Sequence, residues 1–338
     1  MIRVGLDAMG GDDAPSAQVD GAVLALRELP QEFSITLVGR TAEIESHLAR
    51  HAGLDRSRLI IADAPDVIGM AEKPLAAVRK KPKSSLVTGM ALHGKGQLDA
   101  FISAGNTGAT LAAATVILGL YDGVERATVA SLFPTADDSV LVLDSGANVD
   151  CSTKELVNFA RLGTIYARDV LGRPNPKVGL LNVGEEEGKG GAVLRETHLA
   201  LKQLPRMTYI GNIEGGDIVV PHPVHGRIDV VVCDGYVGNV VMKFYESMGK
   251  LFGDLLRRED PDLLASSQLR PVLRFLDASQ YGGAPLLGVK GITIICHGRS
   301  DAAAIVAAIR KAIEAVQGGL LGHIAAELNS LNAPPAAP

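Results

Sequence analysis

The feature that most constrains the fold is a recurring unit: a short apolar run, then a glycine-rich polar loop, then a helix-like segment. In its clearest copy, the apolar run ends at residue 102, the loop SAGNTGA spans residues 103–109, and a helical pattern covers residues 110–120. Short apolar runs bounded by turn residues predict buried strands. Strands that alternate with helices predict an α/β protein with an open, mostly parallel sheet and helices on both faces.

The same unit recurs along the chain. Strands are predicted at residues 2–6, 34–38, 59–62, 98–102, 177–181, 207–210, 228–233 and 291–296, with helices at 16–29, 41–50, 152–171 and 301–316. A turn-rich pentad between two apolar runs, 127–133 and 140–143, predicts an antiparallel hairpin. We expect one α/β domain over residues 1–331 and a disordered tail at 332–338. The carboxyl ends of parallel strands lie along one sheet edge, so the loops are expected to meet in a common crevice.

The loop at residues 103–109 has the features of an anion site. A strand that ends in small polar residues and opens a helix leaves backbone N–H groups unpaired. Ser103, Asn106 and Thr107 can add side-chain hydrogen bonds, and Gly105 and Gly108 let the backbone approach a ligand closely. The alternative is a tight turn with an N-cap.

The other strand ends add polar side chains to the expected crevice. These candidates are Asp7, Gly10, Gly11, Asn148, Asn212, Asp234 and Asn239, with Lys189 and Lys243 as isolated cations. Such a site suits phosphate and a polarised carbonyl. If phosphate is itself the nucleophile, the protein needs only to position it and stabilise the oxyanion. The residues therefore favour acyl transfer to inorganic phosphate.

Composition and motifs exclude several other classes. The net charge is −5 and the charges are mixed, which argues against nucleic acid as a partner. Dinucleotide, P-loop and serine-hydrolase fingerprints are absent, and no cofactor is expected. Prolines flank His222 and separate it from His225, so a loop is expected there and no metal site. Cys151 and Cys233 remain open as nucleophiles or as buried structural thiols.

Cysteine usage and hydropathy indicate where the protein works. The three cysteines lie far apart and form no C-x-x-C pair, which fits a reducing cytoplasm. The first residues do not form a signal peptide, and no apolar run reaches the roughly 18 residues of a spanning helix. We expect a cytoplasmic protein, which leaves open an attachment to the membrane surface.

Five blocks of the sequence carry a resemblance to a known family. DAMGGD (7–12), SAGNTGA (103–109), LDSGAN (143–148), GNIE (211–214) and DVVVCDGYVGN (229–239) resemble, in this order, the bacterial phosphate acyltransferases called PlsX. The resemblance implies a fold like phosphotransacetylases and isocitrate/isopropylmalate dehydrogenases. It implies conversion of long-chain acyl-[acyl-carrier-protein] and phosphate into acyl phosphate, the first step toward phosphatidic acid. A downstream glycerol-3-phosphate acyltransferase, a homodimer and peripheral membrane association are also implied.

The resemblance suggests roles for individual residues. It implies that Lys189 is catalytic, and we expect this lysine, with backbone N–H groups of the 106–108 loop, to bind phosphate and the oxyanion. Asn106, Asn148 and Asn239 would fix the thioester and phosphate. Asp234 or Asp7 would handle the proton. Two departures from the family pattern stand out, Ser145 in place of valine and Phe244 in place of threonine.

Residues 245–281 are expected to form an amphipathic helical hairpin with a break at 260–262. Its candidate membrane contacts at helical spacing are Leu251, Phe252, Leu255, Leu269, Leu273 and Leu276. The alternatives are packing on the same domain or a second subunit, or a surface for a carrier protein. For the whole chain, the competing functions are a short-chain phosphotransacetylase using coenzyme A, a nicotinamide-linked dehydrogenase and a non-catalytic membrane-docking scaffold.

Overall fold

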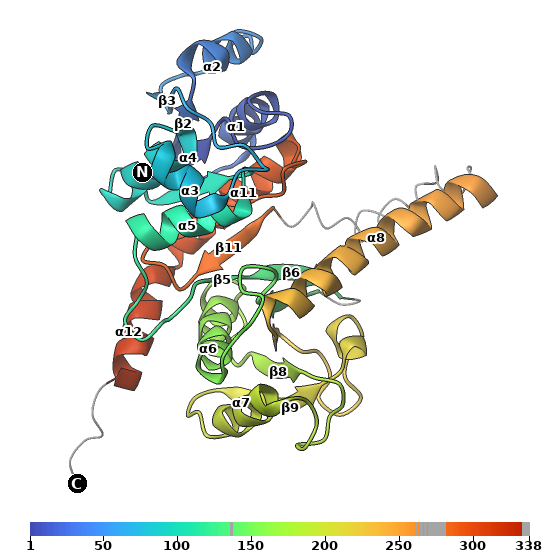
Figure 1. Cartoon of the computed structure of the whole chain (residues 1–338). Coiled ribbons are helices and arrows are strands. Elements are labelled where there is room, and N and C mark those ends of the chain that lie inside the picture. Colours follow the sequence, from blue (N-terminus) through green and yellow to red (C-terminus); the bar gives the residue numbers. More distant parts are fainter. Residues whose placement is uncertain (136–137, 261–262, 264–265, 267–268, 270–281, 333–338) are drawn as a thin grey trace. The chain divides into compact units, whose positions relative to one another are not determined.

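The chain forms two compact units. A computed structural model describes all residues except 136–137, 261–262, 264–265, 267–268, 270–281 and 333–338 (Figure 1). Unit 1 comprises Met1–Val129 and Tyr281–Pro338, and unit 2 comprises Ala130–Gln280. Each unit has its own sheet.

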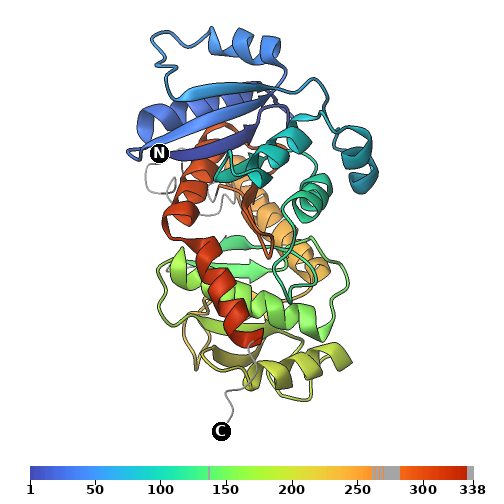
Figure 2. The ribbon, with the colours of Figure 1, turned by 90° about the vertical axis from the view of Figure 1, so that its left-hand side faces the viewer.

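Unit 1 is built on a seven-stranded sheet in the order β3-β2-β1-β4-β12-β11-β5. The first strands of the chain, in blue, lie side by side in Figure 2. The strands of this sheet are β1 (Ile2–Asp7), β2 (Phe33–Gly39), β3 (Leu59–Asp63), β4 (Ala100–Ser103), β5 (Thr128–Val129), β11 (Ala284–Leu287) and β12 (Ile292–Ile295). The first five strands in this order are parallel, and β11 is antiparallel to both β12 and β5. Val4 of β1 lies opposite Ile35 and Ala100, and all three side chains are fully buried.

Helices cover both faces of this sheet. They are α1 (Ser16–Glu28), α2 (Thr41–Leu48), α3 (Pro74–Lys80), α4 (Ser85–Gly94), α5 (Thr107–Ile117), α11 (Ala302–Gln317) and α12 (Leu320–Asn332). The crossover from β3 to β4 runs in the opposite direction to the crossovers from β1 to β3, so right-handed connections place α3 and α4 on the face opposite α1. α1 packs on α11, while α4 and α3 pack on α5.

Unit 2 is built on a five-stranded sheet in the order β6-β7-β10-β8-β9. Its elements are β6 (Ser131–Pro134), β7 (Ser139–Leu143), α6 (Thr153–Asp169), β8 (Lys177–Leu181), α7 (Ala192–Lys202), β9 (Thr208–Ile213), the 3-10 helix η1 (Gly215–Ile218), β10 (Val230–Val232) and α8 (Gly235–Glu259). β6 pairs antiparallel with β7, which confirms the predicted hairpin. The other pairs are parallel.

The predicted fold class is confirmed, but the loops do not all follow strands of one sheet, as was expected; their meeting in a common crevice stays a prediction. The loops after β1 and β4 belong to the sheet of unit 1, and those after β7, β8, β9 and β10 belong to the sheet of unit 2. They do not share one sheet edge. The reason is that antiparallel strands begin the second sheet and end the first, so the parallel order does not run through the chain.

The segment expected to begin a hairpin near residue 245 is the middle of α8, one helix of 25 residues. Only Gly235 and Gly238, at its start, are buried, and its second half extends beyond the body of unit 2 (Figure 1). The second arm of the expected hairpin, with Leu273 and Leu276, lies outside the described residues. Within the described part of the chain, no helix has the length and apolarity to cross a bilayer.

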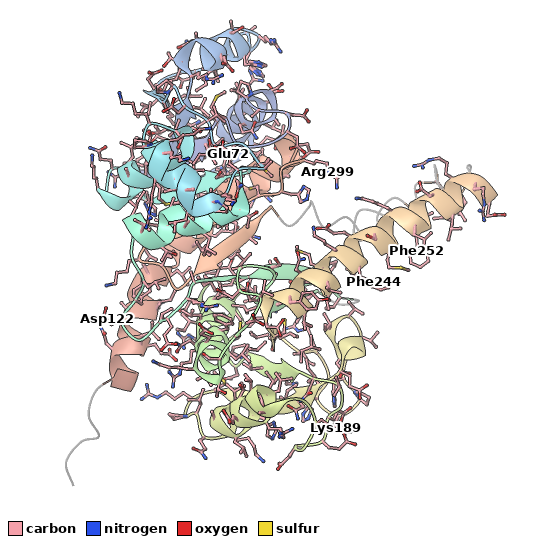
Figure 3. All side chains as sticks on the ribbon, in the orientation of Figure 1. Glu72, Asp122, Lys189, Phe244, Phe252 and Arg299 are labelled. Carbon is pink, nitrogen blue, oxygen red and sulfur yellow. The ribbon has the colours of Figure 1, made fainter. Side chains whose placement is uncertain are left out.

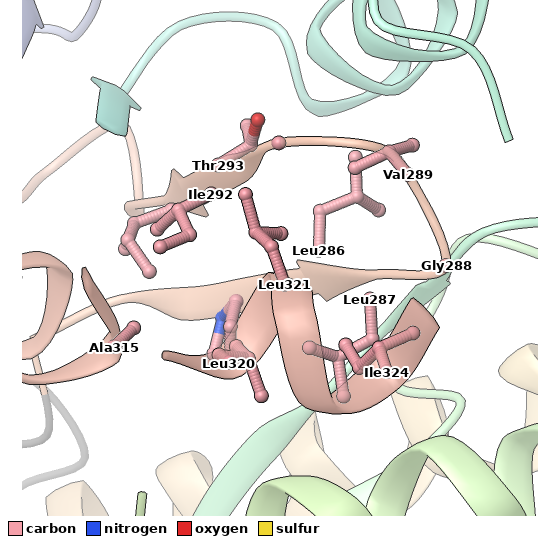
Figure 4. A pocket seen from close by; sticks show the side chains of 13 residues that line it. Leu286, Leu287, Gly288, Val289, Ile292, Thr293, Ala315, Leu320, Leu321 and Ile324 are labelled. Atoms are coloured by element: carbon pink, nitrogen blue, oxygen red, sulfur yellow. The ribbon is translucent and has the colours of Figure 1, made fainter. Parts of the chain in front are cut away.

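A gap in the packing of unit 1 lies between β11, β12 and α12 (Figure 4). It has a volume of about 10 Å³, which holds roughly one water. Leucine, isoleucine and valine side chains, including Leu286, Ile292 and Ile324, form most of its wall. A lining of this kind with so little room indicates imperfect packing and no ligand site.

Candidate active site

Asp7, the last residue of β1, connects the loop after β1 to the loop after β4. The strand order of unit 1 reverses between these two strands. Ligands in open α/β sheets bind at this kind of position. Ser103 donates its hydroxyl to Asp7 Oδ2 at 2.7 Å, and the Met9 N–H donates to Oδ1 at 3.2 Å. Burial raises the pKa of Asp7, against the opposing effect of hydrogen bonds from Ser85 and Ser103. Asp7 is 2% exposed, so its carboxyl group holds the two loops together from the protein interior.

The two glycines of the first loop are required by close packing. A side chain on Gly10 would place its Cβ 2.7 Å from Asp7 Oδ2 and 2.8 Å from the Gly105 nitrogen. Gly11 has a φ of +124°, which strains any other residue, and its Cβ would lie 2.8 Å from Gln18 Nε2. Gln18 in turn donates to the Gly10 carbonyl at 2.6 Å. The absence of side chains at Gly10 and Gly11 therefore serves loop-to-loop packing, and the contact of this loop with phosphate stays a prediction.

The glycines of the second loop also accommodate neighbouring protein. A Cβ on Gly105 would lie 3.2 Å from Ser103 Oγ, and one on Gly108 would lie 2.6 Å from Pro74 Cγ. Gly108 thus lets α3 start directly against α5. Thr107, the first residue of α5, is exposed and leaves its side chain accessible to a ligand.

The start of α5 has the geometry of an anion site. Asn106 is the N-cap, and its Oδ1 accepts from the Ala109 N–H at 3.0 Å. No acceptor among the described residues pairs with the backbone N–H groups of Asn106, Thr107 and Gly108. Three N–H groups at the positive end of a helix dipole favour an anion such as phosphate.

The Asn106 side chain is fully engaged with protein, which assigns it to building this site. Its Nδ2 donates to the carbonyls of Met70 at 2.9 Å and Glu72 at 3.1 Å, with a longer contact of 3.4 Å to Gly69. It is 8% exposed. Asn106 therefore ties the 69–72 segment to the start of α5, and its side chain presents neither amide atom to a ligand.

Asp144 organises the first loop of unit 2 in the way that Asp7 organises unit 1. Its carboxylate accepts from the N–H groups of Gly146, Ala147 and Asn148 at 2.6–3.2 Å. It also accepts from the Asn148 side chain at 2.8 Å, so this amide is engaged in the loop as well. Asp144 was absent from the expected site. The sequence does indicate Asp144 by its place: like Asp7, it is an aspartate at the point where a buried strand meets a glycine-rich loop.

The start of α8 lies directly on the Asp144 loop. A Cβ on Gly238 would lie 1.9 Å from the Asp144 carbonyl oxygen, which explains the glycine. Asp234 is the N-cap, accepting from the Val237 N–H at 2.8 Å. The Asp234 carboxylate is therefore engaged in capping its own helix.

Asn239 and Lys243 form the accessible part of this region. They stand four residues apart on α8 and therefore share one face of the helix. Asn239 is partly exposed beside Gly146, and Lys243 is exposed. Among the described residues, neither the Asn239 amide nor the Lys243 ammonium has a hydrogen-bond partner or ion pair. Both remain available to an anionic substrate.

Lys189 lies in the loop after β8, at the outer edge of unit 2 (Figure 3). Its side chain is 50% exposed, and its Nζ lies 3.7 Å from Glu186 Oε2. The aliphatic stem lies over Gly184, where a Cβ would come within 3.1 Å of Lys189 Cγ. A half-exposed ammonium with one distant partner can bind an anion at little cost, because exposed ion pairs contribute roughly 0–1 kcal/mol.

Two buried asparagines hold this loop by its backbone. Asn182 Nδ2 donates to the Lys189 carbonyl at 3.2 Å, while its Oδ1 accepts from the Val183 N–H at 2.8 Å. Asn212 Nδ2 donates to the Glu186 carbonyl at 3.0 Å. Asn212 was expected to bind substrate, whereas the structure assigns its amide nitrogen to the loop. Asn182 was not among the expected residues.

Glu185, Asp217 and His222 place oxygen and nitrogen atoms within 4.8 Å of one another, the arrangement of a possible metal site. His222 Nδ1 accepts from the N–H groups of Val224 at 3.1 Å and His225 at 3.2 Å. A neutral ring that accepts at Nδ1 carries its proton on Nε2, the atom that faces Glu185 at 3.6 Å. That atom is then a donor to the carboxylate and has no lone pair for a metal.

The cysteines do not have the environment of nucleophiles. Burial raises the pKa of Cys151 to about 12, and it raises the pKa of Cys233 well above its ordinary value. Nearby Asp144 and Asp234 act in the same direction. Because the thiolate is the reactive form, the raised pKa values favour the structural-thiol alternative that the sequence left open.

The two sheets and their helices define the fold class of the protein. Its fold is that of phosphotransacetylases. The enzyme from Streptococcus pyogenes aligns with a TM-score of 0.65 at 18% identity, covering 94% of each chain. The EutD phosphotransacetylase from Staphylococcus aureus aligns with a TM-score of 0.63 at 16% identity, again covering 94% of each chain.

The chain belongs to the family described as fatty acid synthesis protein, whose model matches residues 2–322. It is 44% identical over 318 residues to the phosphate acyltransferase of Salinibacter ruber, covering 92% of this chain and 93% of the relative. It is 45% identical over 324 residues to the phosphate acyltransferase of Thermosynechococcus vestitus, covering 93% and 92%. The resemblance carried by the five sequence blocks is confirmed.

Proposed function

We propose that this protein is a phosphate acyltransferase that moves a long-chain acyl group from acyl-carrier-protein to inorganic phosphate. The observation that carries the proposal is the start of α5, where three backbone N–H groups have no acceptor among the described residues. The family assignment and the relatives named phosphate acyltransferase support it. The acyl phosphate formed is a substrate for a glycerol-3-phosphate acyltransferase, and the reaction is the first step toward phosphatidic acid.

The reaction needs positioning and charge stabilisation. A phosphate oxygen attacks the thioester carbonyl carbon, the C–S bond breaks, and the thiolate takes up the proton that phosphate gives up. The N–H groups at the start of α5 bind phosphate, and the Lys189 ammonium stabilises negative charge on phosphate or the carbonyl oxygen. Asn239 and Lys243 bind the substrate through their accessible ends. Asp7 and Asp144 hold the loops that present these groups.

The test is release of free thiol from acyl-[acyl-carrier-protein], measured with and without inorganic phosphate. We expect release that requires phosphate and yields one acyl phosphate for each thiol. Thiol release that is independent of phosphate would show a thioesterase, and the absence of release and of any acyl phosphate would refute the proposal. A non-catalytic membrane-docking scaffold predicts neither thiol release nor acyl phosphate.

A short-chain phosphotransacetylase is the second candidate, favoured by the fold shared with the enzymes from Streptococcus pyogenes and Staphylococcus aureus. That likeness, at 16–18% identity, concerns the fold alone. The two functions differ in the thiol carrier. Rates with palmitoyl-[acyl-carrier-protein] and with acetyl-coenzyme A, measured at equal concentration, distinguish them.

The protein works in the cytoplasm as a homodimer attached peripherally to the membrane. Three free cysteines support a reducing compartment. Leu251, Phe252 and Leu255 share one side of α8 and are 37–48% exposed, and Phe244 is 67% exposed (Figure 3). An apolar row of this kind suits a lipid surface or a second copy of the chain. Leu269, the fourth expected contact within the described residues, is half-buried.

A further inference from the structure

The most basic stretch of the chain is α3 with the turn that follows it. Five cations stand between residues 73 and 83, at Lys73, Arg79, Lys80, Lys81 and Lys83, and no aspartate or glutamate stands among them. The chain as a whole carries a net charge of −5. This stretch is therefore positively charged in a protein whose net charge is negative.

Four of these five cations form no ion pair with a described residue, although Lys80 interacts with Glu72 electrostatically at longer range. Lys81 is the exception, pairing with Glu72 at 2.6 Å and donating to the Val67 carbonyl at 2.8 Å. The other four are exposed, and none forms an ion pair with a described residue. On α8, by contrast, Arg257 pairs with Asp254 at 2.6 Å and Arg258 with Glu259 at 2.7 Å.

The exposed side of α3 combines charge with a small apolar centre. Leu75 is 45% exposed and stands four residues before Arg79, while exposed Ala76 stands four residues before Lys80. Ala77 on the opposite side is buried. We call the exposed set the α3 basic face. It consists of Lys73, Leu75, Ala76, Arg79, Lys80 and Lys83.

The α3 basic face begins where the proposed phosphate site begins. Pro74 at the start of α3 lies against Gly108 at the start of α5, 2.6 Å from the position of a Cβ. Asn106, the N-cap of α5, donates to the carbonyl of Glu72 at 3.1 Å. A macromolecule seated on α3 would therefore be held next to the helix start that binds phosphate.

We propose that the α3 basic face docks an acidic surface of the acyl-carrier-protein and so delivers the thioester to the start of α5. The inference rests on the proposed function, which requires a protein-borne substrate. Charge complementarity selects an acidic partner and speeds its association. An anionic membrane is the less suitable occupant, because Leu75 is the only large apolar side chain of this face and membrane-bound helices need a broad apolar side.

The test compares two double variants with the same change in charge. Arg79→Glu with Lys80→Glu reverses the α3 basic face. Arg50→Glu with Lys95→Glu reverses two exposed cations of unit 1 outside it, and neither of these forms an ion pair with a described residue. We expect the first pair to raise KM for acyl-[acyl-carrier-protein] about tenfold at low salt, without changing KM for phosphate. We expect Arg50→Glu with Lys95→Glu to leave both KM values unchanged.

Two further measurements make the result decisive. The first is activity with a small acyl thioester of N-acetylcysteamine, which the reversal of Arg79 and Lys80 should leave unchanged. The second is binding of acyl-[acyl-carrier-protein] by calorimetry, which reports docking even if turnover is absent. Loss of binding without turnover would refute the proposed function and support the docking surface. Equal effects of both double variants, or lost binding to phosphatidylglycerol vesicles with carrier binding intact, would overturn the docking surface.

Discussion

The side-chain amide of Asn182 donates a hydrogen bond to the backbone carbonyl of Lys189 at 3.2 Å. Asn182 directly follows β8, so the bond closes the loop between the end of a strand and the proposed catalytic cation. Gly190, with a φ of +80°, lies so close that a Cβ would come within 2.6 Å of Asn182 Oδ1. The position of Lys189 thus depends on a buried amide seven residues before it.

The first prediction concerns this amide. Asn182→Asp keeps the acceptor for the Val183 N–H but removes the donor to Lys189. We expect kcat for thiol release to fall roughly 10- to 100-fold, because small displacements of catalytic groups have effects of this size. The thermal midpoint should change little. Full activity in Asn182→Asp would show that this bond does not position Lys189, and Asn212→Asp tests the second loop contact in the same assay.

The second prediction concerns Lys189 itself. Lys189→Ala should lower kcat/KM about 10²–10³-fold, the usual effect of removing one group that stabilises developing charge. Stability should stay within about 0.5 kcal/mol of the parent, because the side chain is half-exposed and its ion pair is long. The measurements are phosphate-dependent thiol release and urea unfolding. A folded Lys189→Ala protein with undiminished activity would exclude Lys189 from the mechanism.

The third prediction tests the contact between α3 and α5. Gly108→Ala places a Cβ 2.6 Å from Pro74 Cγ, so one helix must shift. We expect a loss of about 1–3 kcal/mol in the free energy of unfolding, as for other overpacked sites. Gly253→Ala on α8 is the control, since a Cβ there meets nothing within 4 Å. It should raise stability slightly, because alanine favours helix over glycine. Equal effects of the two variants would contradict this account.

The fourth prediction concerns a buried cation. Burial lowers the pKa of Lys311 from 10.5 to about 8, and its Nζ donates to the Gly283 carbonyl at 2.7 Å. Between these pH values the unfolded chain binds a proton that the folded chain does not. The contribution of Lys311 to the free energy of unfolding therefore rises from about pH 8 to pH 10.5.

Lys311→Met removes this titration. Denaturant unfolding of both proteins at pH 7.5, 9 and 10 gives the difference in stability at each pH. We expect the parent to gain stability relative to Lys311→Met as the pH rises. A difference that stays constant over this range would show that Lys311 keeps its ordinary pKa in the folded protein.

The fifth prediction concerns the apolar row of α8. Leu251→Glu with Phe252→Glu should abolish sedimentation with phospholipid vesicles, because each change replaces an apolar contact with a charge. Val116→Glu on α5 is the control, since Val116 is 67% exposed but lies outside the row. Sedimentation velocity on the same proteins reports the homodimer. Unchanged vesicle binding and unchanged mass in the double variant would remove α8 from both roles.

Local sequence pattern predicted the elements of this fold well. The strand at residues 177–181 has the bounds of β8, and the predicted hairpin is the β6–β7 pair. These succeed because periodicity and turn residues act within a few positions of the chain. The short strand β11 was missed, since four residues carry too little pattern, and the predicted run at 127–133 is divided between β5 and β6.

The sequence by itself determined the α/β class, the glycine loops after the strands, the family and the candidate cations. Only the tertiary structure decided that the loops belong to two sheets, that Asp144 organises one of them, and that Asn106 and Asn212 use their amides on the backbone. It also decided which cations of residues 73–83 stay unpaired. The reason is physical: helix and strand preferences are local, whereas the partner of a buried amide or a charge is chosen by packing between distant segments.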